Sequence, residues 1–294
     1  MEQTKKMPLL MGGIVGDIAG SRFEFSPIKS KEFELLKMSG NQFQEKQSFR
    51  DYRENCHFTD DTVMTLAVAN ALLDANGNYD NLNELLVKNM KEFGRQHRYA
   101  GYGAKFNAWL NSQKSEPYNS FGNGSAMRIG AVPYFAKDIE ELKSLSRLVT
   151  VVTHNHEEGI KGAEAVASCI WLAWHNNSKQ QIKDYVEKNY YNLDFDYDQL
   201  LKTYVHDESC QNSVPQSIYA FLISTDYEDA IRTAISMGGD ADTMACIAGS
   251  IAEAFYGMPK DLEERGMKFL TEDLKEVLKK FDDKFKMINK KDKF

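Results

Sequence analysis

The sequence predicts an all-α protein that folds as a single compact multi-helix domain. Along most of the 294 residues, apolar side chains recur at intervals of three and four, which is the helical period. Sustained two-residue alternation, the mark of half-buried strands, is almost absent, and no internal repeat or low-complexity block divides the chain. We therefore expect one domain over 1–294, with a core at about 8–258 and a charged helical tail at 259–294.

The individual helices follow from the same periodicity. The clearest one covers 60–75 and ends at Asn76-Gly77-Asn78, a strong helix-stopping sequence. Two polar segments, 26–57 and 176–213, carry little period, and only one short helix is expected within them. The other predicted helices cover 82–93, 106–110, 142–152, 159–174, 182–190, 214–222, 227–237 and the apolar run that follows Asp240.

Gly12, Gly16 and Gly20 recur every four residues near the start of the chain. On a helix they would form one smooth face that lets another backbone approach closely. The Gly-Lys-Ser/Thr ending of a phosphate loop is absent, and no clear strand precedes the glycines as a dinucleotide fingerprint requires. The pattern therefore indicates helix packing rather than nucleotide binding.

Composition narrows the class of protein. With 42% hydrophobic and 27% charged residues the chain is typical of globular proteins, and its net charge of −7 argues against a broad nucleic-acid-binding surface. Four scattered cysteines without a C-x-x-C pair favour a reduced, cytoplasmic protein. Lys5, Lys6 and the apolar run 7–15 resemble the start of a signal peptide, but Asp17 and Arg22 follow at once, so we reject one. No stretch approaches the roughly 18 apolar residues of a membrane span. The oligomeric state is left open.

Two short motifs are chemically alike and stand ahead of apolar helical runs: Thr59-Asp60-Asp61 and Asp240-Ala241-Asp242-Thr243. Gly238 and Gly239 permit a tight turn before the second, and Asp240 is a candidate N-cap. If the motifs converge, their carboxylates cannot all stay ionised without compensation, and neither motif contains Lys or Arg. Oxygen ligands suit Mg²⁺, Mn²⁺ or Ca²⁺ rather than zinc. We predict two divalent cations; the alternative is a pair of acidic helix starts that complement the helix dipole.

The loop at 117–133 is rich in Gly, Asn and Ser and leads into an apolar run. Such a loop offers backbone N–H groups to an anion, and the alternative is a plain connector. Structural or surface roles are expected for most histidines (His57, His97, His156, His206), and core positions for Trp109, Trp171 and Trp174.

Five separated motifs, taken together and in order, resemble the ADP-ribosylglycohydrolase family. They are Gly12–Gly20, Phe58–Thr62, Gly122–Arg128, Thr153-His154 and Gly238–Thr243. The resemblance implies an all-α fold with a dinuclear Mg²⁺ (or Mn²⁺) centre. It places the metal ligands at Thr59, Asp60, Asp61, Asp240, Asp242 and Thr243, the residues already singled out by their chemistry.

The resemblance also implies the substrate-binding residues. Glu24 would lie near the metals and the ribose, and the loop Ser120-Phe121-Gly122-Asn123-Gly124 would bind the diphosphate and its ribose, with Ser125, Met127 and His154 in the same region. The chain departs from the family pattern at Ala241, where many members carry Thr, and at Phe121, where Tyr is often found.

The function implied is metal-dependent hydrolysis of the glycosidic bond between ADP-ribose and an acceptor, which reverses ADP-ribosylation. The acceptor could be arginine, serine, a nucleic-acid base or a small molecule. Asp61, Asp242 and Glu24 are the candidate catalytic carboxylates, and the sequence does not rank them. Two questions stay open: whether Asp17 acts in structure or in catalysis, and whether Arg128 pairs with a carboxylate of the cluster. A two-metal nucleotide phosphohydrolase and a non-enzymatic ADP-ribose-binding module are the alternative functions.

Overall fold

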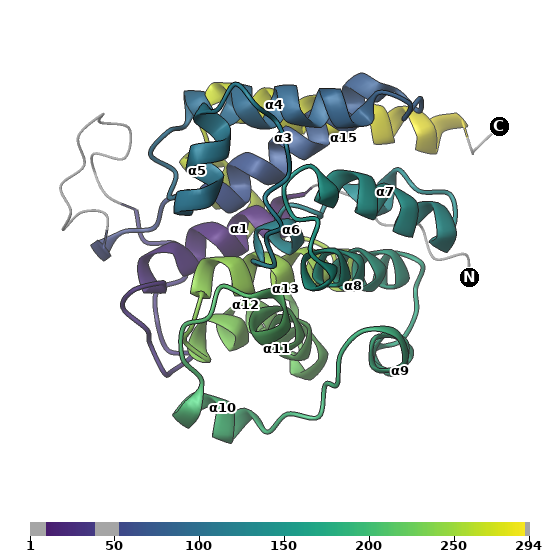
Figure 1. Cartoon of the computed structure of the whole chain (residues 1–294). Helices are drawn as coiled ribbons and strands as arrows, with labels where there is room; N and C mark the ends of the chain where they lie inside the picture. Colours follow the sequence, from purple (N-terminus) through teal and green to yellow (C-terminus); the bar gives the residue numbers. More distant parts are fainter. Residues whose placement is uncertain (1–9, 39–52, 292–294) are drawn as a thin grey trace.

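The chain is all-helical in the computed structural model, which describes residues 10–38 and 53–291, with side chains up to 286 (Figure 1). Within these ranges the only β-pairing is an isolated bridge between Gly122 and Ser209. The predicted all-α class is thereby confirmed. The expectations for the first nine residues and for the 39–52 part of the polar segment lie outside the described residues.

Helix α13 (Ala241–Tyr256) forms the centre of the fold, and nearly all of its side chains are buried. It packs against α1 (Met11–Gly20), α8 (Glu157–Trp174), α11 (Cys210–Ile223) and α12 (Tyr227–Ser236). Figure 1 shows it in the middle of the molecule, with α1 on one side and α11 and α12 on the other. The second acidic motif therefore begins a helix that is fixed from several directions.

The contact between α1 and α13 depends on the glycine series. A Cβ atom on Gly12, Gly16 or Gly20 would lie 2.5, 2.1 or 2.4 Å from a backbone carbonyl oxygen of α13. Real Cβ contacts are never that short, so only glycine lets the two backbones touch. The predicted smooth helix face is confirmed.

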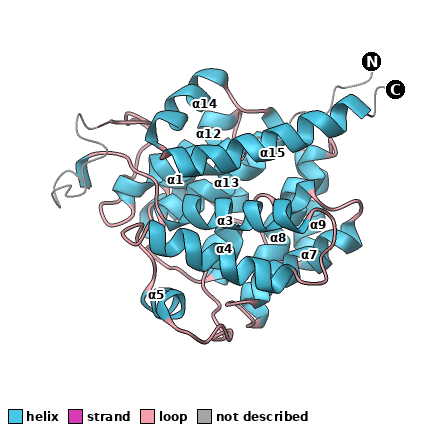
Figure 2. Cartoon of the chain, turned by 90° about the horizontal axis from the view of Figure 1, so that it is seen from above, coloured by secondary structure: helices cyan, strands magenta, loops and turns pink. Residues whose placement is uncertain are grey.

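A second group of helices covers this core. Helices α3 (Asp60–Ala75) and α4 (Leu82–Gln96) lie side by side, and α15 (Glu272–Lys291) packs against α3 (Figure 2). The bounds of α3 match the prediction, and Asn76 ends it in the left-handed conformation with φ 46°.

The C-terminal region contributes to the core more than its charge suggests. It forms α14 (Lys260–Gly266), a 3₁₀ turn at Met267–Phe269 and then α15. One face of α15 is fully buried through Leu274, Val277, Leu278, Phe281 and Phe285. The described part of the segment predicted as a surface-packing tail therefore packs into the core of the fold.

The remaining helices are α5 (Ala104–Asn111), α6 (Gly124–Met127), α7 (Ile139–Val151), α9 (Lys179–Asn189) and α10 (Tyr197–Thr203), with 3₁₀ turns at Ser21–Phe23 and Val132–Tyr134. Helix α10 was not predicted, although Tyr197, Leu200 and Tyr204 recur at helical spacing, because the surrounding segment is polar and Leu200 is the one buried residue of the helix. Asp196 adds a second local signal, since it accepts a capping hydrogen bond from the Gln199 N–H.

Two further expectations are met. Trp109 is buried, while Trp171 and Trp174 pack against the core, and all four cysteines are buried and unpaired. Among the helices that the structure describes, none combines the length and the apolar composition needed to cross a bilayer.

Candidate functional site

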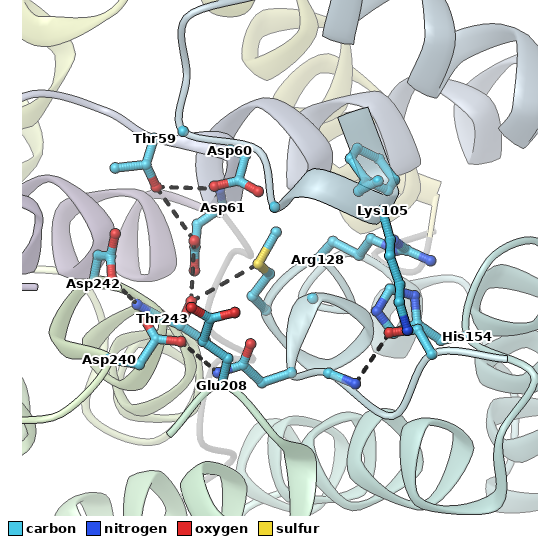
Figure 3. A pocket seen from close by; sticks show the side chains of 18 of the residues that line it. Thr59, Asp60, Asp61, Lys105, Arg128, His154, Glu208, Asp240, Asp242 and Thr243 are labelled. Carbon is cyan, nitrogen blue, oxygen red and sulfur yellow. Dashed lines mark hydrogen bonds between the residues drawn. The ribbon is translucent and has the colours of Figure 1, made fainter. Parts of the chain in front are cut away.

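A cleft of about 310 Å³ brings the two acidic motifs together (Figure 3). Its walls come from the N-terminal ends of α3 and α13, the loop before α6, and the start of α5. The predicted convergence of the motifs is confirmed, since the cleft is lined by Glu24, Thr59, Asp60, Asp61, Asp240, Asp242 and Thr243.

Asp17, at the end of α1, anchors the first motif. Its buried carboxylate accepts hydrogen bonds from the Thr59 backbone N–H (3.0 Å), the Thr59 hydroxyl (2.7 Å), the Thr62 N–H (3.1 Å) and the Thr62 hydroxyl. Thr59 is the N-cap of α3 and accepts in turn from the Asp61 N–H. Asp17 does not line the cleft, and these four hydrogen bonds favour the structural role among the two that the sequence left open.

The second motif enters α13 through a tight turn. Gly238 and Gly239 have φ values of 65° and 124°, which confirms the turn predicted from the glycine pair. Asp240 occupies the N-cap position, but its side chain makes no capping hydrogen bond. It accepts instead from the Asn123 amide at 2.7 Å, because the cleft loop offers a partner that faces the site.

The two motifs touch each other directly. The Thr243 hydroxyl donates to Asp61 Oδ2 at 3.2 Å. Carboxylate oxygens of Asp17, Asp61 and Asp242 lie within 4.8 Å of one another, and so do those of Glu24, Asp240 and Asp242. Asp242 thus belongs to two adjoining groups of three carboxylates.

This donor set fits divalent cations. Asp61 Oδ1 is buried and has no hydrogen-bond partner among the described residues, so this carboxylate oxygen is available to bind a cation. In the same part of the chain, no Lys or Arg forms an ion pair with a carboxylate of the cluster. All donors are oxygens, as Mg²⁺ and Mn²⁺ prefer.

Burial and mutual repulsion favour the neutral form of four carboxyl groups of the cluster when no cation is bound: Glu24, Asp60, Asp61 and Asp242. Burial and, as the second cause, electrostatic repulsion from Asp240 raise the pKa of Glu24 to about 8. Burial, then Asp17 and Asp240, raises the pKa of Asp60 to about 8. The pKa values of Asp61 and Asp242 rise well above the usual range for the same two reasons. A bound cation would favour the ionised forms.

The loop predicted to bind the diphosphate is fastened to two neighbouring segments. The N–H groups of Tyr118 and Asn123 donate to the carbonyl oxygens of Thr153 (3.2 Å) and Glu208 (2.7 Å). The Cys210 N–H donates to the Phe121 carbonyl at 2.9 Å. The loop therefore keeps a fixed shape beside the acidic cluster.

Most of the predicted substrate-binding residues face the cleft: Ser120, Gly122, Asn123, Gly124, Met127 and His154. Ser125 does not. It is fully buried, and its hydroxyl donates to the Gly159 carbonyl at 2.8 Å, so it holds the loop in place. Phe121 is 47% exposed and borders a shallower neighbouring hollow that it shares with His206 and Glu208.

Arg128 forms no ion pair with the cluster in the described part of the chain. It is buried beside the cleft and donates to the Thr153 hydroxyl at 2.7 Å. The sequence interpretation also missed Lys105, Tyr118 and Glu208, which line the cleft from α5, the loop and the segment before α11. Tyr118 belongs to the loop 117–133 that the sequence singled out, whereas Lys105 and Glu208 belong to no local pattern and only the fold brings them to the site.

Comparison with known proteins identifies the family. A model of the ADP-ribosylglycohydrolase family matches residues 4–290. The chain belongs to this family. Among curated proteins it is similar to "ADP-ribosylhydrolase ARH3" of Gallus gallus (26% identity; 84% of this chain and 84% of the relative) and of Homo sapiens (25%; 85% and 84%). A "Putative ADP-ribosyl glycohydrolase L543" of Acanthamoeba polyphaga mimivirus is 26% identical over 84% of this chain and 85% of the relative.

A solved structure has the same fold. A solved chain described as an "ADP-ribosylglycohydrolase-related protein complex" superposes with a TM-score of 0.69, at 20% identity, over 95% of this chain and 96% of that one. The expected family and fold are both confirmed.

Proposed function

We propose that the protein is a metal-dependent hydrolase that releases ADP-ribose from an acceptor by cleaving the glycosidic bond between them. The observation that carries this proposal is the meeting of Asp61, Asp240, Asp242 and Glu24 at one side of a cleft whose other side is the loop 120–124. Family membership supports the reaction class, and the names of the relatives point to ADP-ribosylated substrates.

Two Mg²⁺ or Mn²⁺ ions would be held by Thr59, Asp60, Asp61, Asp240, Asp242 and Thr243, with Glu24 beside them. When bound, such ions supply Lewis-acid polarisation and lower the pKa of water. Asp17 and Asn123 keep the donor set in shape, because each hydrogen-bonds a residue of one acidic motif.

The chain's own carboxylates carry the proton transfer in this proposal. Water attacks C1 of the ribose and the bond from C1 to the acceptor breaks; a carboxylate takes one proton from the water and relays it to the departing atom of the acceptor, which leaves free ADP-ribose and the protonated acceptor. Asp61, Asp242 and Glu24 are the candidates. Negative charge at the same place also stabilises the oxocarbenium character of the transition state.

The charge distribution favours one orientation of the substrate. Carboxylates gather around the two acidic motifs, while the cations that line the cleft are Lys105 and the buried Arg128. Figure 3 shows Lys105 and His154 at the end away from Asp242. A diphosphate placed at loop 120–124 would lie near the cationic groups, and the ribose to be cleaved would lie at the acidic end.

Release of free ADP-ribose from arginine-, serine- and guanine-linked conjugates, with Mg²⁺ and with a chelator, tests the proposal. We expect release from at least one conjugate that is lost on chelation and in Asp242→Asn. Asp198→Asn, an exposed carboxylate on α10, is the matched control and should keep the activity. Release of inorganic phosphate instead would identify a phosphohydrolase, and tight ADP-ribose binding without release would identify a binding module.

A further inference from the structure

Three buried polar side chains, Arg128, Thr153 and His154, form a hydrogen-bonded chain in the wall of the cleft. Arg128 is 1% exposed, and its Nη2 donates to the Thr153 hydroxyl oxygen at 2.7 Å. The same oxygen lies 2.7 Å from His154 Nδ1. Thr153 is fully buried, and His154 is 4% exposed and lines the cleft.

The direction of the protons in this chain follows from the chemistry of its members. A guanidinium only donates, so the Thr153 oxygen is the acceptor of the first hydrogen bond. The hydroxyl hydrogen of Thr153 then needs an acceptor of its own, and His154 Nδ1 is the one that the described residues provide. If Nδ1 carried a proton, the hydroxyl hydrogen would be buried without a partner.

The other ring nitrogen of His154 faces the loop. A Cβ atom on Gly124 would lie 3.3 Å from His154 Nε2, and one on Gly122 would lie 3.7 Å from it. Glycine at these positions leaves space between Nε2 and the loop backbone. An unprotonated Nδ1 requires the neutral ring to carry its hydrogen at Nε2, so a single N–H donor points at this space.

We propose that Arg128 and Thr153 are positioning residues that fix His154 as the neutral Nε2–H tautomer, so that it donates a hydrogen bond to an anionic group of the ligand at loop 120–124. Under the proposed function, on which the identity of the ligand rests, this group is a diphosphate oxygen of ADP-ribose. In this proposal Arg128, which also forms part of the cleft wall, acts on the orientation of His154 through Thr153.

The surroundings favour the neutral ring. Burial, followed by the positive charge of Arg128, lowers the pKa of His154 well below its usual value. The ring of Tyr118 lies beside it, with ring centroids 6.0 Å apart, and further restricts its orientation. A neutral donor also differs from a lysine or arginine, because it orients an oxygen atom without adding charge next to the metal cluster.

Nitrogen-15 NMR of histidine-labelled wild-type protein without ligand tests the tautomer directly. His154 is assigned as the signal that disappears in His154→Gln. We expect a neutral ring at pH 7, with the shift of an unprotonated acceptor at Nδ1 and of an N–H at Nε2. An Nδ1–H tautomer or an imidazolium at this pH would overturn the proposal.

A pair of Thr153 variants tests the relay. Thr153→Ser keeps the hydroxyl and should keep both the tautomer and the affinity for ADP-ribose. Thr153→Val keeps the shape but not the hydroxyl, and should weaken ADP-ribose binding roughly tenfold, the loss expected for one hydrogen bond to a charged group, measured by calorimetry. A folded Val variant that retains the Nε2–H signal and wild-type affinity refutes the relay.

Failure of the function can be told apart from failure of this inference. Wild-type protein that shows the predicted tautomer but does not bind ADP-ribose would contradict the proposed function and the ligand, and leave the relay standing. Binding of ADP-ribose by a protein that shows the other tautomer would contradict the relay and leave the proposed function standing.

Discussion

We expect the binding of Mg²⁺ at the acidic cluster to depend on pH in a definite direction, because the pKa values of its carboxyl groups are raised. Without a cation, the pKa values of Glu24 and Asp60 are about 8, against ordinary values of 4.5 and 3.8. The folded protein therefore holds protons that the unfolded chain releases. The contribution of these two groups to stability is fully present below about pH 4 and is lost as the pH rises towards and through 8. A cation opposes this loss because it favours the ionised carboxylates.

The size of the effect follows from the same pKa values. To bind a cation at pH 6, a carboxyl with a pKa of about 8 must first give up its proton, and at pH 8 half of the groups are already ionised. The apparent affinity for Mg²⁺ should rise about 50-fold over this interval for each proton displaced, or about 2.3 kcal/mol. At 100 times the dissociation constant, Mg²⁺ adds about 2.7 kcal/mol to the free energy of unfolding.

Thermal unfolding in a MgCl₂ titration at pH 6 and pH 8, with a chelator as the starting point, measures both quantities. We expect a shift of several degrees in the unfolding temperature that saturates at a much lower Mg²⁺ concentration at pH 8. Asp242→Asn should lose the shift, and the exposed Asp198→Asn should keep it. Equal Mg²⁺ affinity at the two pH values would refute the reasoning about displaced protons, and no shift at either would refute the metal site.

Three more predictions concern the fold and the cleft. Gly16→Ala places a Cβ 2.1 Å from the Ala245 carbonyl oxygen and should reduce the free energy of unfolding by about 3 kcal/mol in denaturant titrations, whereas Gly103→Ala, which meets nothing within 4 Å, should stay near wild type. Asp17→Ala leaves two backbone N–H groups and the Thr62 hydroxyl at the start of α3 without acceptors; it should destabilise by about 3–6 kcal/mol and abolish the Mg²⁺ shift, and a variant that keeps wild-type stability and the shift would contradict its anchoring role. Lys105→Met should raise KM for the ADP-ribosyl substrate about tenfold with kcat little changed, because the lysine lines the cleft away from the carboxylates; a drop in kcat alone would place it in the chemistry instead.

The acidic half of the site could be predicted because its information is local. Each motif places its ligands within four residues, ahead of an apolar run that had to become a helix. Helix geometry then puts the Asp and Thr side chains at one end of that helix. The convergence of the N-terminal ends of α3 and α13 was inferred from the matching chemistry of the two motifs. The structure confirms it, because α13 is held in place by packing against several helices at once.

The remaining residues of the site could not be predicted from local sequence patterns. Glu24 entered through resemblance to the family, because it follows a 3₁₀ turn and belongs to no chemical pattern of its own. Lys105 and Glu208 are ordinary surface residues in the sequence, and only tertiary packing brings α5 and the segment before α11 to the cleft. Ser125 shows the converse, since a residue inside a binding motif can serve the loop rather than the ligand.

A cation beside two helix N-termini requires explanation, because the N-terminal N–H groups carry a partial positive charge of about half a unit. At α3 the structure supplies the answer. Asp17 accepts hydrogen bonds from the Thr59 and Thr62 N–H groups, and the Thr59 hydroxyl accepts one from the Asp61 N–H. The negative charge of Asp17, which does not line the cleft, therefore complements the partial positive charge at the N-terminus of α3. Asp61 is thereby left to face the cleft, with its carboxylate hydrogen-bonded by the Thr59 and Thr243 hydroxyls and not by an N–H of its own helix. Asp17 can reach this position because α1 lies in backbone contact with α13, and that contact requires the glycine at position 16 directly before it. The glycine series is therefore part of the construction of the candidate metal site, although no glycine of α1 lines the cleft.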